Sequence, residues 1–403
     1  MQSAITSSER EAKGLSSHQS AQERIEQLAI EVCLGGFGER LQALVLTGSM
    51  ARGEASIAAS AAGSQVLGDA EFLLVFKHDQ KADHVQARAL GAEMRESLMR
   101  SGIDCPISFA AVGENYLRNL PPHIFGYELR TCGRVLCGDM QILGLVPAMS
   151  PSDIPREDAW RLLCNRLMEQ FDCAAELPAG DMASPALRYR VLKLYLDLAT
   201  SLLVFAGRYK PTYVERAREL RKLAGSLPAI DLSRLASTVE AATRLKLHPQ
   251  DAALEASFWA EHTWRGAISD ARAIWRWQLE QLVGPGQLGS DQQLVSRWAR
   301  RHSLRSRVRG WLYVMRECGW LEKITQWPQW LRCALSSSPR NLIYAAGSEL
   351  LFALADQTSE AEMNSATTRI LLPLRTSAAQ PGWRQFAADI ASNYHQFVEH
   401  TRA

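Results

Sequence analysis

The sequence predicts an α/β-layered domain of the α+β class, followed by an all-helical domain. Up to about residue 149, short apolar runs that are typical of buried strands alternate with helical stretches. Beyond that point, apolar residues recur only at helical spacing. The length of 403 residues is enough for two or three domains. We therefore expect a flexible tail over 1–20, the mixed domain over 21–149 and the helical domain over 150–403.

The mixed domain is expected to begin with a helix. Residues 1–20 are rich in Ser, Gln, Glu and Ala and have little to bury, which predicts a frayed tail. From residue 21 to about residue 33, four apolar residues then stand at i, i+3, i+4 and i+7. They would form one apolar stripe on a helix: Ile25, Leu28, Ala29 and Val32.

A sheet is predicted next, because several short apolar runs follow. The runs are 41–46 (LQALVL), 71–76 (EFLLVF), 107–112 (ISFAAV) and, as a fourth strand or a strand edge, 134–137 (RVLC). Between the second and third runs, residues 82–100 have helical spacing. The small residues of 55–64 predict a flexible surface loop, which costs little to close.

The helical domain is predicted from capping and spacing. A cap and an early proline at 152–155 precede apolar residues at helical spacing, and a nearly all-apolar helix over 187–206 ends at Gly207. Most tryptophans beyond residue 250 are spaced as core residues. A break into two helical subdomains near 225–250 or 284–291 is an alternative. Further helical texture covers 254–283, 291–318, 340–355 and 383–400.

Composition excludes several classes of protein. The 47% hydrophobic and 22% charged fractions are those of an ordinary globular chain, and the formal net charge of +2 predicts no partner by itself. No run of 18 uncharged apolar residues is present, and the N-terminus is polar. Eight scattered cysteines without a C-x-x-C pair favour reduced, buried thiols. We expect a cytoplasmic protein with no membrane partner.

The residues with the clearest chemistry lie around the first two strands. The run 41–46 ends at Thr47-Gly48-Ser49, and a strand that turns through Gly-Ser into a helix offers backbone N–H groups to a phosphate. Asp69 and Glu71 stand two apart at the start of the second strand, so both carboxylates share a face. At about 4 Å they would repel by roughly 4 kcal/mol at an effective dielectric near 20. A magnesium ion would relieve that repulsion and bridge to phosphate oxygens.

These residues resemble the nucleotidyltransferase signature of the DNA polymerase β superfamily. That signature has an apolar residue before Gly-Ser, a spacer, and an Asp-x-Asp/Glu pair on the next strand. Residues 46–49 and 69–72 match it, and Arg52 matches an arginine that often follows the Gly-Ser turn. The resemblance covers about the first 140 residues. One departure is the spacer of 19 residues between Ser49 and Asp69, which is longer than usual.

The resemblance implies a nucleotidyltransferase domain with a mixed sheet, and it also implies an enzymatic activity. The enzyme would transfer a nucleoside monophosphate, most simply AMP, from a nucleoside triphosphate to a hydroxyl acceptor and release pyrophosphate. Gly48, Ser49 and Arg52 would bind the nucleotide, and Asp69 and Glu71 would hold Mg²⁺, with a two-metal site as one form. The acceptor, a small molecule, a protein or RNA, is not specified by the sequence.

Two further roles are less well defined. The third carboxylate of the family comes from a later strand, here 103–112, where alternation makes Asp104 the candidate catalytic base; Glu114 and Asp139 are alternatives. Related enzymes offer a lysine from a helical domain to the triphosphate, and Lys193 is the candidate here. The alternative for Lys193 is an ion pair with Asp197, four residues on. If the base is missing, the protein would be a degenerate nucleotide-binding regulator or scaffold.

A basic cluster supplies a separate hypothesis. Residues 297–309 (RWARRHSLRSRVR) contain six arginines and a tryptophan. Such a run can hold an anionic partner such as RNA, a glycan or an acidic carrier. The alternative is a solvated helix face that pairs with acidic residues of the bundle. An RNA-binding or RNA-modifying protein is therefore a further, less favoured function.

Overall fold

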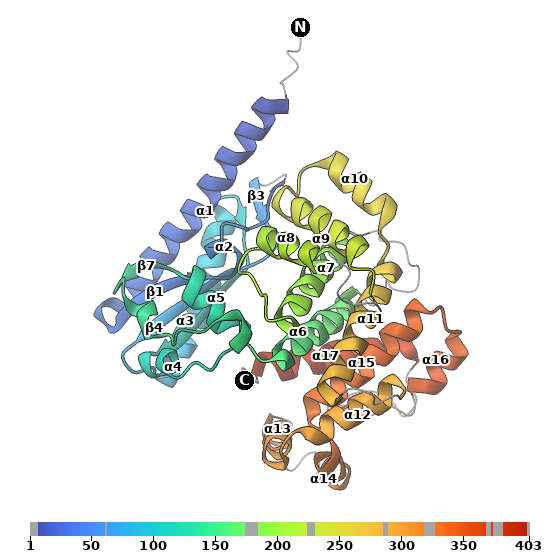
Figure 1. Ribbon diagram of the computed structural model, residues 1–403. Helices are drawn as coiled ribbons and strands as arrows, with labels where there is room; N and C mark the ends of the chain where they lie inside the picture. Colours follow the sequence, from blue (N-terminus) through green and yellow to red (C-terminus); the bar gives the residue numbers. More distant parts are fainter. Residues whose placement is uncertain are drawn as a thin grey trace. The chain divides into compact units, whose positions relative to one another are not determined.

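The chain forms two compact units in the computed structural model (Figure 1). The first comprises residues up to 155 together with 206–219 and 240–257, and the second comprises 156–205, 220–239 and the chain from 258 onward. The sequence predicted one boundary near residue 150, and it did not predict that the two later segments join the first unit. The structure describes residues 7–60, 63–173, 184–223, 230–284, 289–317, 327–367, 372–373 and 382–400.

A four-stranded mixed sheet is the centre of the first unit, as predicted. Its strand order is β6 (Ile107–Gly113), β4 (Ala70–Phe76), β1 (Leu41–Thr47) and β7 (Arg134–Gly138). Strand β1 is antiparallel to both of its neighbours, β4 and β7, whereas β4 and β6 are parallel. All four strands coincide with the apolar runs of the sequence to within a residue or two, because continuous apolar runs suit a sheet that is covered on both faces.

Helices cover both faces of this sheet. Helices α1 (Ser7–Phe37) and α3 (Lys81–Arg100) pack on one face, where Phe72 and Leu74 of β4 point. The other face carries Leu73 and Val75 and packs against α4 (Glu114–Arg118), α5 (Ile124–Cys132) and the 3-10 helix η2 (Ile142–Leu145). Alternation along β4 therefore places Glu71 on the α5 side of the sheet.

Two predictions for this unit are wrong. Residues 7–20 continue α1 instead of forming a frayed tail, and their glutamate, arginine, alanine and lysine are good helix formers. The predicted loop over 55–64 is a pair of strands, β2 (Ile57–Ser60) and β3 (Gly63–Val66). They join the two-residue strand β5 (Ile103–Asp104) in a second sheet of order β2-β3-β5.

The expected strand over 103–112 is divided. Its first two residues pair with β3 in the second sheet, and its continuation is β6 in the first sheet. The break falls at Cys105-Pro106, where proline lacks the N–H that a ladder needs. The short helix α2 (Gly48–Ala51) follows β1, and the 3-10 helix η1 (Gly38–Arg40) precedes it.

No strand follows β7 in the described part of the chain, which agrees with the predicted all-helical domain. Helix α7 (Pro185–Phe205) is buried along most of its length, and no described helix is long and apolar enough to cross a membrane. Of the tryptophans predicted in the core, Trp264 and Trp275 are fully buried. The helical elements are η3 (Pro151–Asp153), α6 (Arg156–Met168), η4 (Glu169–Cys173), α7 (Pro185–Phe205), α8 (Tyr213–Lys222), α9 (Leu232–Leu247), α10 (Ala252–Glu261), α11 (Trp264–Val283), α12 (Asp291–Arg301), α13 (Leu304–Glu317), α14 (Trp327–Ser336), α15 (Pro339–Ala355), α16 (Glu360–Thr367) and α17 (Trp383–His400).

Candidate functional site

Gly48 and Glu71 are brought together at one end of the sheet. Thr47, the last residue of β1, pairs with Glu71 of β4, and the Thr47 hydroxyl donates a hydrogen bond to the Glu71 carbonyl oxygen at 3.2 Å. Gly48 has a φ of +66°, and a Cβ placed on it would lie 2.1 Å from Glu71 Oε2. The Glu71 carboxylate therefore occupies the space that only a glycine leaves open.

Asp69 and Ser49 are the residues close in sequence to this contact that were predicted to bind the ligand. Asp69 immediately precedes β4, is exposed, and shares by alternation the face of Glu71. Ser49 is half-buried in α2, and its hydroxyl makes no hydrogen bond within the described residues. Helix α2 has only four residues, so the helix-end charge expected at Gly48-Ser49 is small.

The neighbouring strand supplies no carboxylate at this level of the sheet. Ser108 of β6 is the residue that pairs with Glu71 of β4. Phe109 and Ala111 pack toward α1 and α3, and Ala110 and Val112 pack on the other side, so alternation puts Ser108 on the face of Glu71. A third carboxylate on β6 would be expected at this position, and the chain has a hydroxyl there.

Asp104 lies in the second sheet. It pairs with Gln65 of β3, and the Gln65 side-chain amide donates to its carboxylate at 3.5 Å. Cys105 lies between β5 and β6, and burial raises the pKa of its thiol to about 12. A hydrogen bond from the Ala70 backbone N–H opposes that rise, whereas the carboxylates of Asp69 and Asp104 add to it. Asp104 and Asp69 are thus both near Cys105, but Asp104 is not on the strand beside Glu71, because the proline break separates β5 from β6.

The two alternative carboxylates lie at the opposite end of the first sheet. Glu114 follows the last residue of β6 and pairs with Arg118 at 2.8 Å. At about 3.3 Å per residue, it stands roughly 20 Å along the strand direction from Ser108. Asp139 follows β7, and its carboxylate accepts the Gln141 N–H at 2.8 Å. Neither placement suits a catalytic base at Gly48.

The Arg52 side chain does not extend into solvent, because it joins a network of ion pairs with Glu54 and Glu128. Its side chain is 5% exposed, its Nη1 lies 2.7 Å from Glu128 Oε2, and its Nε lies 3.3 Å from Glu54 Oε2. Burial alone would lower the pKa of Arg52, but the Glu128 carboxylate and the hydroxyl of Tyr213 raise it above its ordinary value. The predicted contact with phosphate would require this guanidinium to leave Glu128.

Glu128 is the centre of that network, which sequence reasoning did not predict. Besides Arg52, its carboxylate accepts hydrogen bonds from the Tyr209 hydroxyl and the Arg216 guanidinium. Arg216 is 3% exposed, and its guanidinium stacks 4.6 Å from the Tyr209 ring centroid. Glu128, Tyr209 and Arg216 are 76 or more residues away from Arg52 in sequence, so no local pattern reveals these pairings, whereas Glu54 is a local partner two residues away.

Lys193 belongs to the second unit. It lies on α7 with its ammonium 5.7 Å from the centroid of the Tyr189 ring. Asp197, its expected alternative partner, instead pairs with Arg166, with 2.6 Å between Arg166 Nε and the carboxylate. The contact of Lys193 with a triphosphate stays a prediction.

A small cavity lies beside Gly48 and Glu71. It has room for about 30 Å³ and is closed on one side by Glu128 and Leu129 of α5. That volume suits a water molecule and not a nucleotide. A triphosphate would therefore have to lie on the outer side of the corner, toward the exposed Asp69.

The side chains at this corner fit a magnesium ion in part. Magnesium is commonly held by one or two carboxylates and completed by waters and phosphate oxygens, which is the set that Asp69 and Glu71 would leave open. Among the described residues, no group of three or more His, Cys, Asp or Glu side chains could hold a metal ion.

Comparison of the chain with protein-family models, with curated proteins and with solved structures found no match. Membership of the nucleotidyltransferase superfamily therefore stays a prediction that rests on the residues and the mixed sheet.

Proposed function

We propose that the first unit binds a magnesium–nucleoside triphosphate at the Gly48 corner and transfers the nucleoside monophosphate, most simply AMP, to a hydroxyl acceptor. The contact between the Glu71 carboxylate and Gly48, at the end of two paired strands, is the observation that supports this proposal. The acceptor is a small molecule, a protein or RNA.

The side chains would divide the work of binding. Gly48 lets a phosphate approach the main chain because it has no Cβ, and the Ser49 hydroxyl is available as a donor. Asp69 and Glu71 would hold magnesium, which when bound neutralises the charge of the phosphates. Because the carboxylate of Glu71 now covers Gly48, it would have to turn toward the ion when the nucleotide binds.

A second function is favoured by one observation. Ser108 stands beside Glu71 where a carboxylate base would be expected, and a serine hydroxyl does not accept a proton from an attacking alcohol at neutral pH. In this alternative, the protein binds the nucleotide and regulates or scaffolds another process without transfer. The two functions share the binding residues and differ only in the release of pyrophosphate.

The test is incubation of the full chain with each labelled nucleoside triphosphate, Mg²⁺ and a cell extract that supplies acceptors. We expect one triphosphate to release pyrophosphate and to label an acceptor. The variants Asp69→Asn and Glu71→Gln should lose this activity, while Glu93→Gln, an exposed residue of α3, should keep it. Tight nucleotide binding without pyrophosphate release would favour the second function.

Two results would contradict both proposed functions. One is equal nucleotide binding by the parent and the Asp69→Asn variant. The other is the absence of any magnesium-dependent binding of the four triphosphates to the parent chain, measured by equilibrium dialysis.

A further inference from the structure

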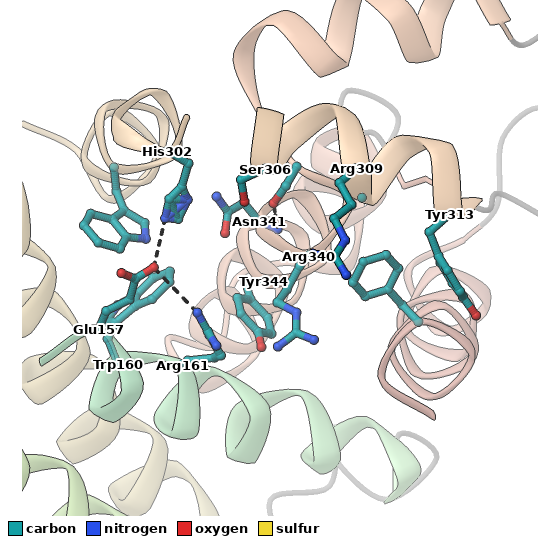
Figure 2. A pocket seen from close by; sticks show the side chains of 14 residues that line it. Glu157, Trp160, Arg161, His302, Ser306, Arg309, Tyr313, Arg340, Asn341 and Tyr344 are labelled. Atoms are coloured by element: carbon teal, nitrogen blue, oxygen red, sulfur yellow. Dashed lines mark hydrogen bonds and ion pairs between the residues drawn. The ribbon is translucent and has the colours of Figure 1, made fainter. Parts of the chain in front are cut away.

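The second unit contains a cavity of about 440 Å³ (Figure 2). Its walls come from α6, from α12 and the residue that follows it, from α13, from α15 and from α17, so it is built within this unit alone. Figure 2 shows Glu157 and Arg161 of α6 on one side and Ser306 and Arg309 of α13 on the other. The volume lies within the range of pockets that bind small molecules.

Positive charge predominates on the lining. Arg161, Arg309 and Arg340 face a single carboxylate, that of Glu157. Glu157 is already engaged, because its Oε1 lies 3.0 Å from His302 Nε2 and 3.7 Å from Arg161. Arg309 has no ion-pair partner among the residues that the structure describes. The pocket therefore offers a guanidinium to an anion that the chain does not supply.

His302 adds no positive charge to the cavity lining near neutral pH. Burial lowers its pKa below the ordinary 6.5, the Glu157 carboxylate opposes that change, and the guanidinium groups of Arg161 and Arg307 add to it. The attraction for an anion thus comes from the arginines.

Five buried polar atoms on the lining have no hydrogen-bond partner within the described residues, and three of them are N–H groups that can only donate. The side chain of Asn341 is in a residue that is 4% exposed, and its Nδ2 has no hydrogen-bond partner within the described parts of the chain. The same is true of the indole nitrogens of Trp160 and Trp298. A buried donor without a partner costs about 1–3 kcal/mol. All three groups donate, so a ligand that satisfies them must bring acceptor oxygens or nitrogens.

Aromatic rings form the rest of the wall. Trp160 packs edge-on against Trp298, with 5.9 Å between ring centroids, and against Tyr344 at 6.0 Å. Phe397 of α17 also lines the cavity. Walls of this kind favour a flat ring, which can pack by its edge or face and can stack with a guanidinium.

We propose that this cavity binds a small organic anion that carries an aromatic ring. Its charged group, a phosphate or a carboxylate, contacts Arg309 and the donor of Asn341, and its ring packs against the tryptophans. The site is distinct from the Gly48 corner and does not depend on the nucleotidyltransferase proposal.

Only part of the basic cluster over 297–309 belongs to this site. Of residues 297–309, only Trp298, His302, Ser306 and Arg309 line the cavity. Arg300 and Arg305 are exposed and do not line it. Of these three exposed arginines, Arg309 alone lines the cavity, so a pocket for a small anion accounts for Arg309 and leaves Arg300 and Arg305 on the surface.

The test uses phenyl phosphate as the probe and the full chain, with binding measured by calorimetry and by the change in tryptophan fluorescence. We expect saturable binding that is at least about tenfold tighter than that of inorganic phosphate, because only phenyl phosphate fills the aromatic wall. Arg309→Gln should weaken binding about tenfold or more. Arg300→Gln, a change of the same type outside the cavity, should leave it unchanged.

A second variant guards against loss of folding. Ser306→Phe places a ring in the cavity from an exposed position, so it should block binding while the unfolding temperature stays close to that of the parent. Asp69→Asn should bind phenyl phosphate as the parent does. Absence of saturable binding, or inorganic phosphate binding as tightly as phenyl phosphate, would overturn the proposal. So would equal losses with Arg300→Gln and Arg309→Gln, which would instead indicate a basic surface such as one for RNA.

Discussion

The carboxylate of Glu71 lies directly against the Cα of Gly48, where a Cβ would be 2.1 Å from Glu71 Oε2. Gly48 also has a φ of +66°, which costs other residues roughly 1–2 kcal/mol. A Cβ at this position thus meets backbone strain and also displaces the Glu71 carboxylate, whose flexible side chain can turn away at a smaller cost. We expect Gly48→Ala to lower the free energy of unfolding by about 2 kcal/mol in urea titrations.

Gly53 supplies the matched control. Its φ is +70°, yet nothing lies within 4 Å of a Cβ placed on it. Gly53→Ala should therefore cost only the backbone strain, about 1 kcal/mol. Adding Glu71→Ala to Gly48→Ala should recover part of the loss, since it removes the clashing atoms. Equal costs for the two glycine variants would show that Glu71 does not press on Gly48.

Ser108 is the position on β6 at which a third carboxylate can be introduced beside Glu71. Ser108→Asp would place a second carboxylate beside Glu71, and two charges about 5 Å apart repel by roughly 3 kcal/mol at an effective dielectric near 20. We expect this variant to unfold at a lower temperature than the parent without Mg²⁺ and to be stabilised more by added Mg²⁺. Differential scanning calorimetry at increasing Mg²⁺ concentration measures both effects.

Ser108→Asn separates charge from size. It has nearly the volume of aspartate but no charge, so its unfolding temperature should not respond to Mg²⁺ more than that of the parent. If the Asp and Asn variants respond equally, position 108 does not face the carboxylate of Glu71. If Ser108→Asp also raises pyrophosphate release above that of the parent, a carboxylate at position 108 can act as the base.

The sheet could be predicted from the sequence because its strands are continuous apolar runs that need burial on both faces. Gly48 and Glu71 also met as predicted, since the end of one strand and the start of the next fix their register. The hairpin β2–β3 could not be predicted in this way. Its residues are small and partly exposed, so the pattern matched that of a loop.

Long-range pairing explains the other differences. The position of Asp104 depends on the sheet in which β5 pairs. A strand of two residues is too short for the sequence to show a periodic pattern that would predict this pairing. The pairing of Arg52 with Glu128 joins residues 76 apart. Arg52 is 5% exposed in this pair and Glu128 is 17% exposed, so the Arg52 guanidinium is held by Glu128 and is not free to reach a phosphate.

The buried network around Glu128 gives a prediction about stability. Glu128 accepts hydrogen bonds from the guanidinium groups of Arg52 and Arg216, which are 5% and 3% exposed. Removing its charge leaves two buried cations with less compensation. We expect Glu128→Gln to lower the free energy of unfolding by about 3–5 kcal/mol, measured in urea.

An exposed pair gives the comparison for this change. Glu360 of α16 pairs with Arg384 of α17 at 3.0 Å, and both side chains are 61% exposed, so Glu360→Gln should cost less than about 1 kcal/mol. A cost for Glu128→Gln no larger than that of Glu360→Gln would mean that Glu54 alone compensates the two arginines.

The buried thiols predict how stability changes at high pH. Burial raises the pKa of both Cys33 and Cys105 to about 12, from an ordinary 9.0. Below pH 9 each thiol is neutral in the folded and the unfolded chain, so its full contribution to stability is present. Above pH 9 the unfolded chain releases the proton and the folded chain does not, so this stability is lost progressively up to about pH 12. Each thiol should cost roughly 1.4 kcal/mol between pH 8 and pH 10.

Cys105→Ala isolates this effect from the titration of other groups. Urea unfolding of the parent and of the variant at pH 8 and pH 10 gives two differences. The parent should lose about 1.4 kcal/mol more than the variant over that interval, because only the parent has a Cys105 thiol to ionise on unfolding. An identical pH dependence of the two proteins would mean that the Cys105 thiol ionises as readily in the folded chain as in the unfolded one, and that β5 and β6 do not bury it.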